Sequence, residues 1–184
     1  MKRFVSMMKM GLLLAMGHIN AQEARELTRE EKKALQERLD SLLYVDAETA
    51  IENKAFSLEA DQVVFKYGQT AFVSSNTNFV AVNGEDAAVQ VAFNIPASGL
   101  NGLGGVTVDG TISRYETRKD KKGDLFISMD VMGTGISARV DISMRRGSNR
   151  ASVTISPNFN SNRLTLNGVI LPKERSSVFK GSTL

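Results

Sequence analysis

The side chains in this sequence that could do chemistry are carboxylates. A glycoside hydrolase needs only two of them facing each other across a cleft, and the candidates lie in segments where polar and apolar residues alternate. These candidates are Asp109, Asp130 and Asp141, which take outward positions beside Arg139, Arg114 and Arg145. Charged residues on the outer face of a sheet are most often solvated surface groups. We therefore predict no catalytic residues, and we do not expect an enzyme.

Histidine and cysteine are absent from the part of the chain expected to fold. The sequence contains no cysteine and no tryptophan, and its one histidine, His18, lies in an N-terminal segment that matches an export signal. Nucleophilic catalysis, acid–base catalysis near neutral pH and transition-metal binding depend largely on these side chains. The sequence therefore predicts no metal site and no cofactor.

The N-terminus has the order of charge, apolar run and small residue found in signal peptides. Lys2 and Arg3 precede the apolar run Met10–Met16, and Ala21 offers a cleavage site before Gln22. That apolar run is far shorter than the roughly 20 residues that span a bilayer. We expect residues 1–21 to be removed, leaving a periplasmic or extracellular protein without a transmembrane segment.

Cleavage would also remove the excess of positive charge. The chain has 23 basic and 20 acidic residues, and Lys2, Arg3 and Lys9 all lie in the signal. The mature chain is then neutral, which lacks the basic character of nucleic-acid-binding domains. We predict no nucleic-acid partner. Without cysteine there are no disulfides, and roughly 160 residues can bury a sufficient core without them.

The mature chain is expected to open with a helix over 22–45, followed by a single β domain over 46–184. Thr28 and Glu31 have the spacing of a capping box. A leucine stripe at helical spacing follows and is expected to pack against the domain, with a partner-binding helix as the alternative; it comprises Leu35, Leu39, Leu42 and Leu43. A second short helix, capped by Asp46, is expected to reach about Lys54.

From Phe56 onward the apolar residues recur at every second position. Runs of this kind, separated by short polar turns, are typical of antiparallel strands with one buried face. The fold class predicted is mainly β, an antiparallel meander of about eight strands forming a barrel or sandwich, preceded by an N-terminal α-helix.

The turns allow the pairing of the strands to be predicted. A hairpin loop at Gly147-Ser148 places Ile142 opposite Val153 and Val140 opposite Ile155. A loop at Thr134-Gly135 places Asp130 opposite Arg139, which we interpret as a surface ion pair. Lys121-Lys122-Gly123 closes a third hairpin with a solvated tip.

Three longer runs resemble one family. These are FVSSNTNFVAVNG (Phe72 to Gly84), VAFNIPASGLNGLGGVTVDG (Val91 to Gly110) and GSNRASVTISPNFNSNRLTLNG (Gly147 to Gly168). They are similar to an exported family of Bacteroidetes known as domain of unknown function four-two-five-one, from roughly Asp46 to the C-terminus. The resemblance implies export and a Bacteroidetes-type envelope. It implies no catalytic or ligand residues.

Two loops carry side chains suited to binding. The glycine-rich segment Gly99–Gly105 leads into a strand and lacks the lysine of a phosphate-binding loop. It is most simply a flexible connection, but its Leu100 and Leu103 are apolar where polar residues are usual, so a lid or contact surface is the alternative. Asn158 and Phe159 occupy a second turn, where Phe159 could clamp a ligand or tuck under its loop.

Two functions follow, both non-catalytic. The first is an envelope protein that binds or carries a small apolar molecule or lipid in the mouth of a barrel, although the bulky inward side chains argue for a filled interior. The alternative is an interaction protein of the envelope that binds another protein through a sheet edge or an apolar loop. A continuous apolar cavity would favour the carrier, and a dry core with an apolar surface patch would favour the interaction protein.

Overall fold

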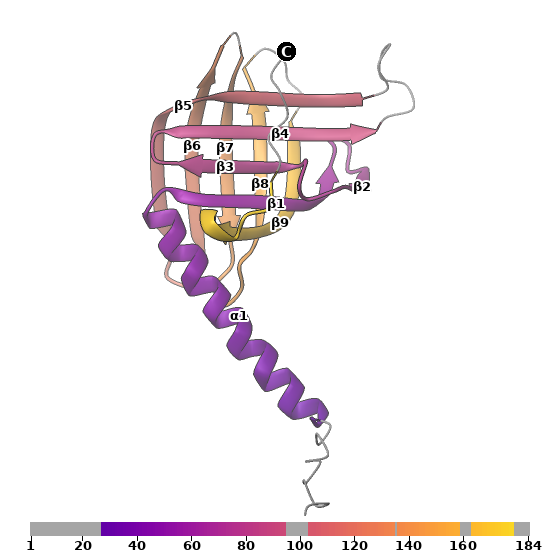
Figure 1. Cartoon of the computed structure of the whole chain (residues 1–184), viewed down its shortest axis with the longest axis vertical. Coiled ribbons are helices and arrows are strands. Elements are labelled where there is room, and N and C mark those ends of the chain that lie inside the picture. The colour runs from indigo at the N-terminus through magenta and orange to yellow at the C-terminus, as the bar shows by residue number, and fades with distance from the viewer. Residues whose placement is uncertain (1–26, 95–102, 135, 159–162, 179–184) are drawn as a thin grey trace, which may run out of the picture. The chain divides into compact units, whose positions relative to one another are not determined.

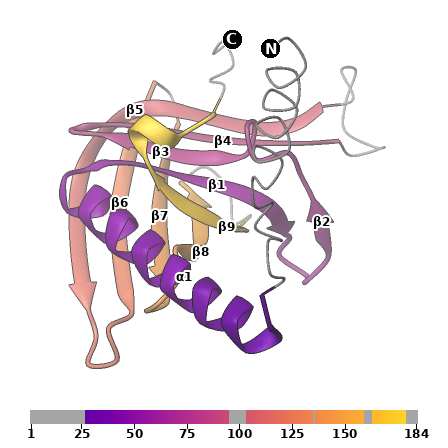
Figure 2. The same cartoon turned by 60° about the horizontal axis from the view of Figure 1, so that its bottom comes forward.

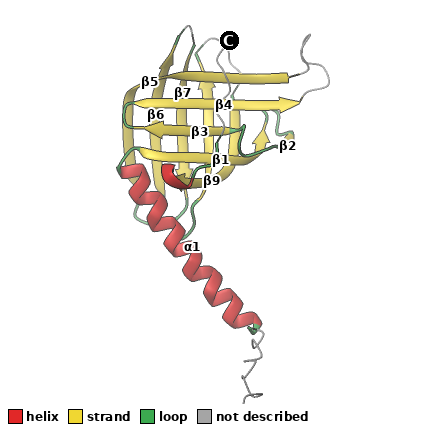
Figure 3. Ribbon diagram, viewed as in Figure 1, coloured by secondary structure: helices red, strands yellow, loops and turns green. Residues whose placement is uncertain are grey.

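A computed structural model describes residues 27–94, 103–134, 136–158 and 163–178 of the 184-residue chain. The chain divides into two compact units, residues 1–35 and 36–184. The second unit contains most of one helix, α1 (Arg29–Glu52), and all of the strands. Figure 1 shows the helix followed by strands, and Figure 3 shows the same elements coloured by type. The prediction of a mainly β fold with an N-terminal helix is confirmed.

Helix α1 begins with the predicted capping box. The backbone N–H of Thr28 donates to Glu31 Oε2 at 2.8 Å, and the N–H of Glu31 donates to Thr28 Oγ1 at 3.2 Å. The helix then runs without a break through Asp46 to Glu52, so one helix stands where two were expected. Lys54, two residues past the end of the helix, has a φ of +50°, the left-handed conformation common just past a helix C-terminus.

The leucine stripe is not the packed face of α1, and that expectation was wrong. Leu35, Leu39 and Leu42 are exposed by 58%, 47% and 65%. The buried face consists of Tyr44, Ala47, Ala50 and Ile51. Periodicity predicts that a helix has an apolar stripe, but it does not say which of two apolar faces meets the sheet.

Within the described part of the chain, nine antiparallel strands follow the helix. Their bounds are β1 (Ala55–Val64), β2 (Thr70–Phe72), β3 (Phe79–Asn83), β4 (Asp86–Asn94), β5 (Leu103–Lys119), β6 (Leu125–Gly133), β7 (Ser137–Met144), β8 (Arg150–Pro157) and β9 (Leu164–Pro172), and a 3₁₀ turn, η1 (Lys173–Arg175), follows β9. From β3 to β9 each strand pairs with the next along the chain, and β1 pairs with both β3 and β9. The sheet therefore closes into an eight-stranded barrel, and β2 is an extra strand on β1.

The predicted pairing of the hairpins is confirmed. Ile142 lies opposite Val153 and Val140 opposite Ile155 between β7 and β8. Asp130 lies opposite Arg139 between β6 and β7. The predicted ion pair between those two residues, however, is not the one that forms. Asp130 instead pairs with Arg114 of β5 at 3.4 Å, and Arg139 pairs with Asp141 two residues along its own strand, also at 3.4 Å.

The strands run in two directions and the sheet turns two corners. In Figure 1, β1, β3 and β4 cross the view while β6, β7 and β8 run along it. Pairing shifts by one residue between Ile112 and Arg114 of β5, and between Ala60 and Gln62 of β1. Such bulges bend a strand and increase its twist. They allow a small sheet to curl back on itself.

Each corner also depends on a glycine. A Cβ added to Gly110 of β5 would lie 2.0 Å from the carbonyl oxygen of Met132, and one added to Gly168 of β9 would lie 2.0 Å from that of Glu59. Real Cβ atoms do not approach backbone oxygens so closely. The backbones of adjacent strands therefore meet at these two points because no side chain separates them.

The interior of the barrel is filled by side chains. Phe56, Leu58, Met129, Ile142 and Ile155 are among the large residues that are at most 2% exposed. They belong to one apolar cluster that also contains the four buried residues of α1. The C-terminal half of α1 thus packs on one end of the barrel, as Figure 2 shows from below. No helix among the described residues is both long and apolar enough to cross a bilayer.

Candidate functional site

Two of the four predicted binding residues, Leu103 and Asn158, belong to the described part of the chain. Leu100 and Phe159 lie outside the described residues. Leu103 is the first residue of β5 and pairs with Asn94, so it belongs to the strand and not to the preceding loop. Asn158 is exposed after β8, where its backbone N–H donates to the carbonyl oxygen of Ser137 at 2.9 Å. Its Nδ2 donates to Ser137 Oγ, so Asn158 ties this turn to the start of β7.

The carboxylates singled out from the sequence lie on the outer surface of the barrel. Asp130 is bound by Arg114, and Asp141 accepts a hydrogen bond from Ser128 Oγ at 2.7 Å as well as pairing with Arg139. Asp109 lines a surface hollow over β3 to β5. Within the described ranges no three potential ligands of the types His, Cys, Asp and Glu are close enough to hold a metal ion.

The surface hollows lined by described residues include two over the outer face of the sheet. One, of about 470 Å³, lies over β5 to β8, and the other, of about 530 Å³, lies over β3 to β5. In the first, Arg139 donates to Ser128 Oγ at 3.0 Å, and the guanidinium of Arg118 lies 4.5 Å from the centre of the Phe126 ring. These polar groups pair largely with one another. The arrangement stabilises the outer surface of the sheet and brings together no acid–base pair in a buried cleft.

The free edge of the sheet is the more distinctive surface. Among the described strands, β2 pairs with β1 alone, through Phe72 opposite Gln62 and Thr70 opposite Val64. The connecting turn is closed by the N–H of Phe65, which donates to the carbonyl oxygen of Gln69 at 2.8 Å. Two aromatic side chains project from this hairpin: Tyr67 is 82% exposed and Phe72 is 86% exposed. Aromatic residues exposed to that degree are unusual in a monomeric surface and often mark a contact.

The backbone of β2 is oriented to accept another strand. The carbonyl oxygen of Gln69 and the N–H of Val73 both face β1, where they bond to Phe65 and Asp61. Backbone groups alternate in direction along a strand. Thr70 and Phe72 therefore present their N–H and C=O groups to the open side of β2. An unpaired strand edge of this kind is a template for strand addition.

The sequence predicts a sheet edge as a possible protein-binding surface, but Tyr67 and Phe72 were not among the predicted site residues. The sequence signal was present in the segment Phe65–Phe72, where aromatic residues stand among glycine, glutamine, threonine and lysine in a turn. Aromatic residues in a turn usually fold back onto the core. Here Tyr67 and Phe72 stay exposed, and the adjoining strand β2 is only three residues long.

The fold is thus a closed antiparallel barrel of eight strands with an added edge strand and a helix packed on one end. The chain belongs to the family described as Domain of unknown function (DUF4251), whose model matches residues 38–170. It is similar to a crystal structure of a DUF4251 family protein from Bacteroides eggerthii DSM 20697 at 1.95 Å resolution. That similarity has 51% sequence identity and a TM-score of 0.71, and covers 81% of this chain and 100% of that chain. No curated protein matches this chain in sequence.

Proposed function

We propose that this protein is an exported, non-catalytic interaction module of the cell envelope that binds a partner protein through β2. The observation that carries this proposal is the outer edge of β2, which pairs with no other described strand, together with the exposed side chains of Tyr67 and Phe72. Export is supported by the charge and apolar order of residues 1–21.

The packed interior favours this function over transport of a small apolar molecule. A carrier needs a continuous apolar cavity, whereas Phe56, Met129 and Ile155 fill the barrel and are at most 1% exposed. Tyr44 and Ile51 of α1 cover one end of the same cluster. Side chains of this size fill the interior of an eight-stranded barrel.

Binding at β2 would follow the physics of strand addition. A partner strand would bond to the outward N–H and C=O groups of Thr70 and Phe72, and these bonds would set its register. Since β2 is only three residues long, backbone bonds would supply a small part of the affinity. Tyr67 and Phe72 would supply the rest by burying apolar surface, of which an aromatic side chain offers about 150–250 Å².

The proposal is tested by cross-linking in the native cells. A photo-reactive residue is placed at Thr70 or at Arg163, which is exposed but lies before β9. We expect one defined cross-linked partner from position 70 and none from position 163. The double variant Tyr67→Ser with Phe72→Ser should abolish that cross-link without changing the melting curve, whereas the control Met132→Ser should preserve it. An undiminished cross-link in the double variant would refute the proposal.

The backbone contribution has its own test. Thr70→Pro removes an outward N–H while leaving the bonds from β2 to β1 in place, because Thr70 faces the open side. The photo-reactive residue cannot share position 70 with proline, so for this comparison it is placed at the exposed Gln69, and we expect Thr70→Pro to weaken the cross-link from there. A cross-link that is lost in the aromatic variant but unaffected by Thr70→Pro would assign the contact to side chains and not to strand addition.

A further inference from the structure

The turns β5–β6 and β7–β8 form one continuous surface at the end of the barrel where α1 packs. The backbone N–H of Arg146 donates to Asp124 Oδ1 at 3.0 Å, which joins the two turns. A Cβ added to Gly123 would lie 2.9 Å from Cδ of Arg146, so the stem of the arginine lies across the glycine. Tyr44 of α1 donates to the carbonyl oxygen of the same glycine at 2.8 Å. Three elements are thus held together at Gly123.

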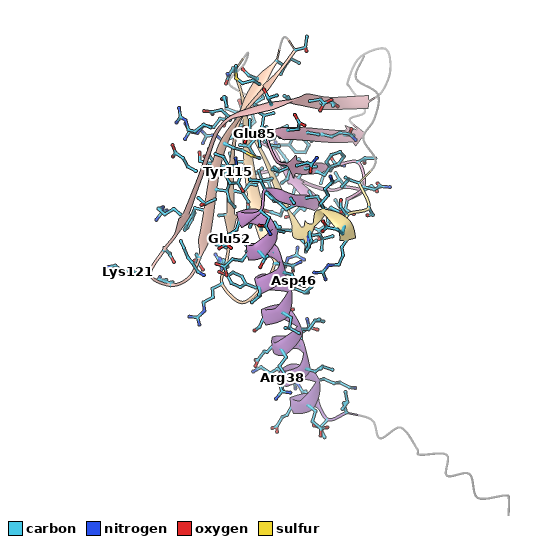
Figure 4. The ribbon with its side chains drawn as sticks, turned by 60° about the vertical axis from the view of Figure 1, so that its left-hand side comes forward. Arg38, Asp46, Glu52, Glu85, Tyr115 and Lys121 are labelled. Carbon is cyan, nitrogen blue, oxygen red and sulfur yellow. The ribbon has the colours of Figure 1, made fainter. Side chains whose placement is uncertain are left out.

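This surface carries a cluster of cations, which we term the basic tip: Lys121, Lys122, Arg145 and Arg146. All four residues are exposed. Figure 4 shows Lys121 at the extremity of the β5–β6 hairpin, pointing away from the barrel. None of the four lines either hollow described above.

The nearby acids are directed toward the backbone. Asp120 Oδ1 accepts the N–H groups of Lys122 and Asp124 at 2.8 and 2.9 Å, and Asp124 accepts that of Arg146. The hydrogen bond from the Asp124 N–H is the main reason that the pKa of Asp120 is lowered, so this carboxylate stays ionised within its turn. Lys119 is separate from the tip, because it pairs with Glu48 of α1 at 2.5 Å. The outward side of the turns is therefore positive.

We propose that the basic tip binds the phosphate headgroups of an anionic lipid surface. The cations stand on protruding turns and not in an enclosed pocket, so an extended surface reaches all of them at once while a small anion does not. Val45, the residue after Tyr44 in α1, is an apolar side chain that is 55% exposed. Basic residues beside exposed apolar ones are the combination that favours the membrane interface. This proposal does not depend on the contact proposed at β2.

The size of the effect follows from the number of charges. Each lysine or arginine near an anionic membrane strengthens binding about fivefold, which is about 1 kcal/mol. Removing two of the four cations should therefore weaken binding about 25-fold. Since the attraction is electrostatic, it should also decline steeply as salt shortens the screening length to about 3 Å at 1 M.

The experiment measures co-sedimentation with vesicles, using the protein purified from its native cells. One vesicle preparation contains phosphatidylglycerol and phosphatidylcholine in equal parts, and the other contains phosphatidylcholine alone. We expect binding to the first that high salt abolishes, and the predicted weakening in the double variant Lys121→Gln with Arg145→Gln. The matched control, Lys66→Gln with Arg163→Gln, removes the same charge elsewhere and should bind like the parent.

Three results would overturn the proposal. They are equal binding to both vesicle preparations, equal weakening in the control variant, and no sedimentation at low salt. If the protein does not bind vesicles but is retained on immobilised polyglutamate, and Lys121→Gln with Arg145→Gln abolishes that retention, the partner of the basic tip is an acidic protein instead. Melting curves of the two double variants should coincide with that of the parent, because the four substituted side chains are exposed.

Discussion

The phenol oxygen of Tyr44 lies 2.8 Å from the carbonyl oxygen of Gly123, to which it donates a hydrogen bond over 79 positions of sequence. This bond joins α1 to the tip of the longest hairpin of the barrel. Further contacts lie along the same helix: Glu48 pairs with Lys119, Asp46 with Arg175, and the Ile51 carbonyl oxygen accepts from Tyr115 at 2.9 Å. The second half of α1 is therefore part of the barrel fold.

Removing the Tyr44 hydroxyl should measure how firmly α1 is held. Tyr44→Phe keeps the buried ring and deletes one hydrogen bond, so we expect a loss of about 0.5–1.5 kcal/mol in the free energy of unfolding. Urea melts provide the measurement. Val45→Ala, at the neighbouring exposed position, should change stability by no more than about 0.5 kcal/mol. Equal losses at the two positions would show that the hydrogen bond contributes nothing specific.

The buried side chains of the β7–β8 hairpin should contribute more to stability than the side chains on its outer face. Ile142 and Ile155 are 2% and 1% exposed, so truncating either to Ala should cost about 2–5 kcal/mol through lost burial and a residual cavity. Ser143→Ala and Thr154→Ala on the outer face should stay within about 0.5 kcal/mol. Comparable losses at Ile142 and Ser143 in urea melts would mean that both faces of the sheet are buried.

The corner at Gly168 should not tolerate a side chain. Gly168→Ala would place a Cβ against the carbonyl oxygen of Glu59, and we expect a loss of about 1–3 kcal/mol or failure to fold. Gly84 is a matched comparison, because it has a φ of +63° and no atom within 4 Å of its added Cβ. Gly84→Asn should cost less, since asparagine adopts left-handed conformations more readily than other residues. A harmless Gly168→Ala would contradict the close approach of β1 and β9.

Tyr115 should make the fold sensitive to alkali. Burial raises the pKa of its phenol above the ordinary value of 10.0, so the folded state keeps the proton that the unfolded state loses. Its contribution to stability is complete below about pH 10 and declines as the pH rises toward the folded pKa. Tyr115→Phe should flatten this decline in urea melts taken at increasing pH. An absorbance titration should show a late-ionising tyrosine that disappears in the variant.

Export is tested at the N-terminus. Because residues 1–21 have the order of a signal peptide, sequencing the protein from the native envelope should give a chain that begins at Gln22. An intact Met1 in the cytoplasmic fraction would contradict the prediction.

The local pairing of strands was predictable because short turns set it. In the hairpin of Ile142 and Val153 every inward residue must lie opposite an inward residue. A shift of the pairing by one position would turn the apolar side chains of one strand to the solvent face. The barrel itself was not predictable from these hairpins. Its closure rests on the pairing of β1 with β9, whose partners Leu58 and Ile170 are far apart in sequence, and no turn specifies their register.

The wrong predictions for the Asp130 ion pair and for the buried face of α1 have a common physical cause. Asp130 of β6 lies opposite an arginine on each neighbouring strand, Arg139 on β7 and Arg114 on β5, and the arginine on β5 is the one that binds it. In the same way α1 had two apolar faces, and only the barrel decides that Ala47 and Ile51 are buried while Leu39 and Leu42 are exposed. Sequence patterns limit each residue to a face. The choice among partners on that face is made by tertiary structure.

The pairing of β1 with β9 bears on how the chain matures. From Phe56 opposite Pro172 to Val64 opposite Thr165, one side of the first strand is completed by the last. A polypeptide that emerges from the ribosome N-terminus first must hold that side of β1 open until nearly the whole domain has been synthesised. Non-local closure of this kind slows folding, and any product truncated before Leu164 would retain two long unprotected edges that invite aggregation.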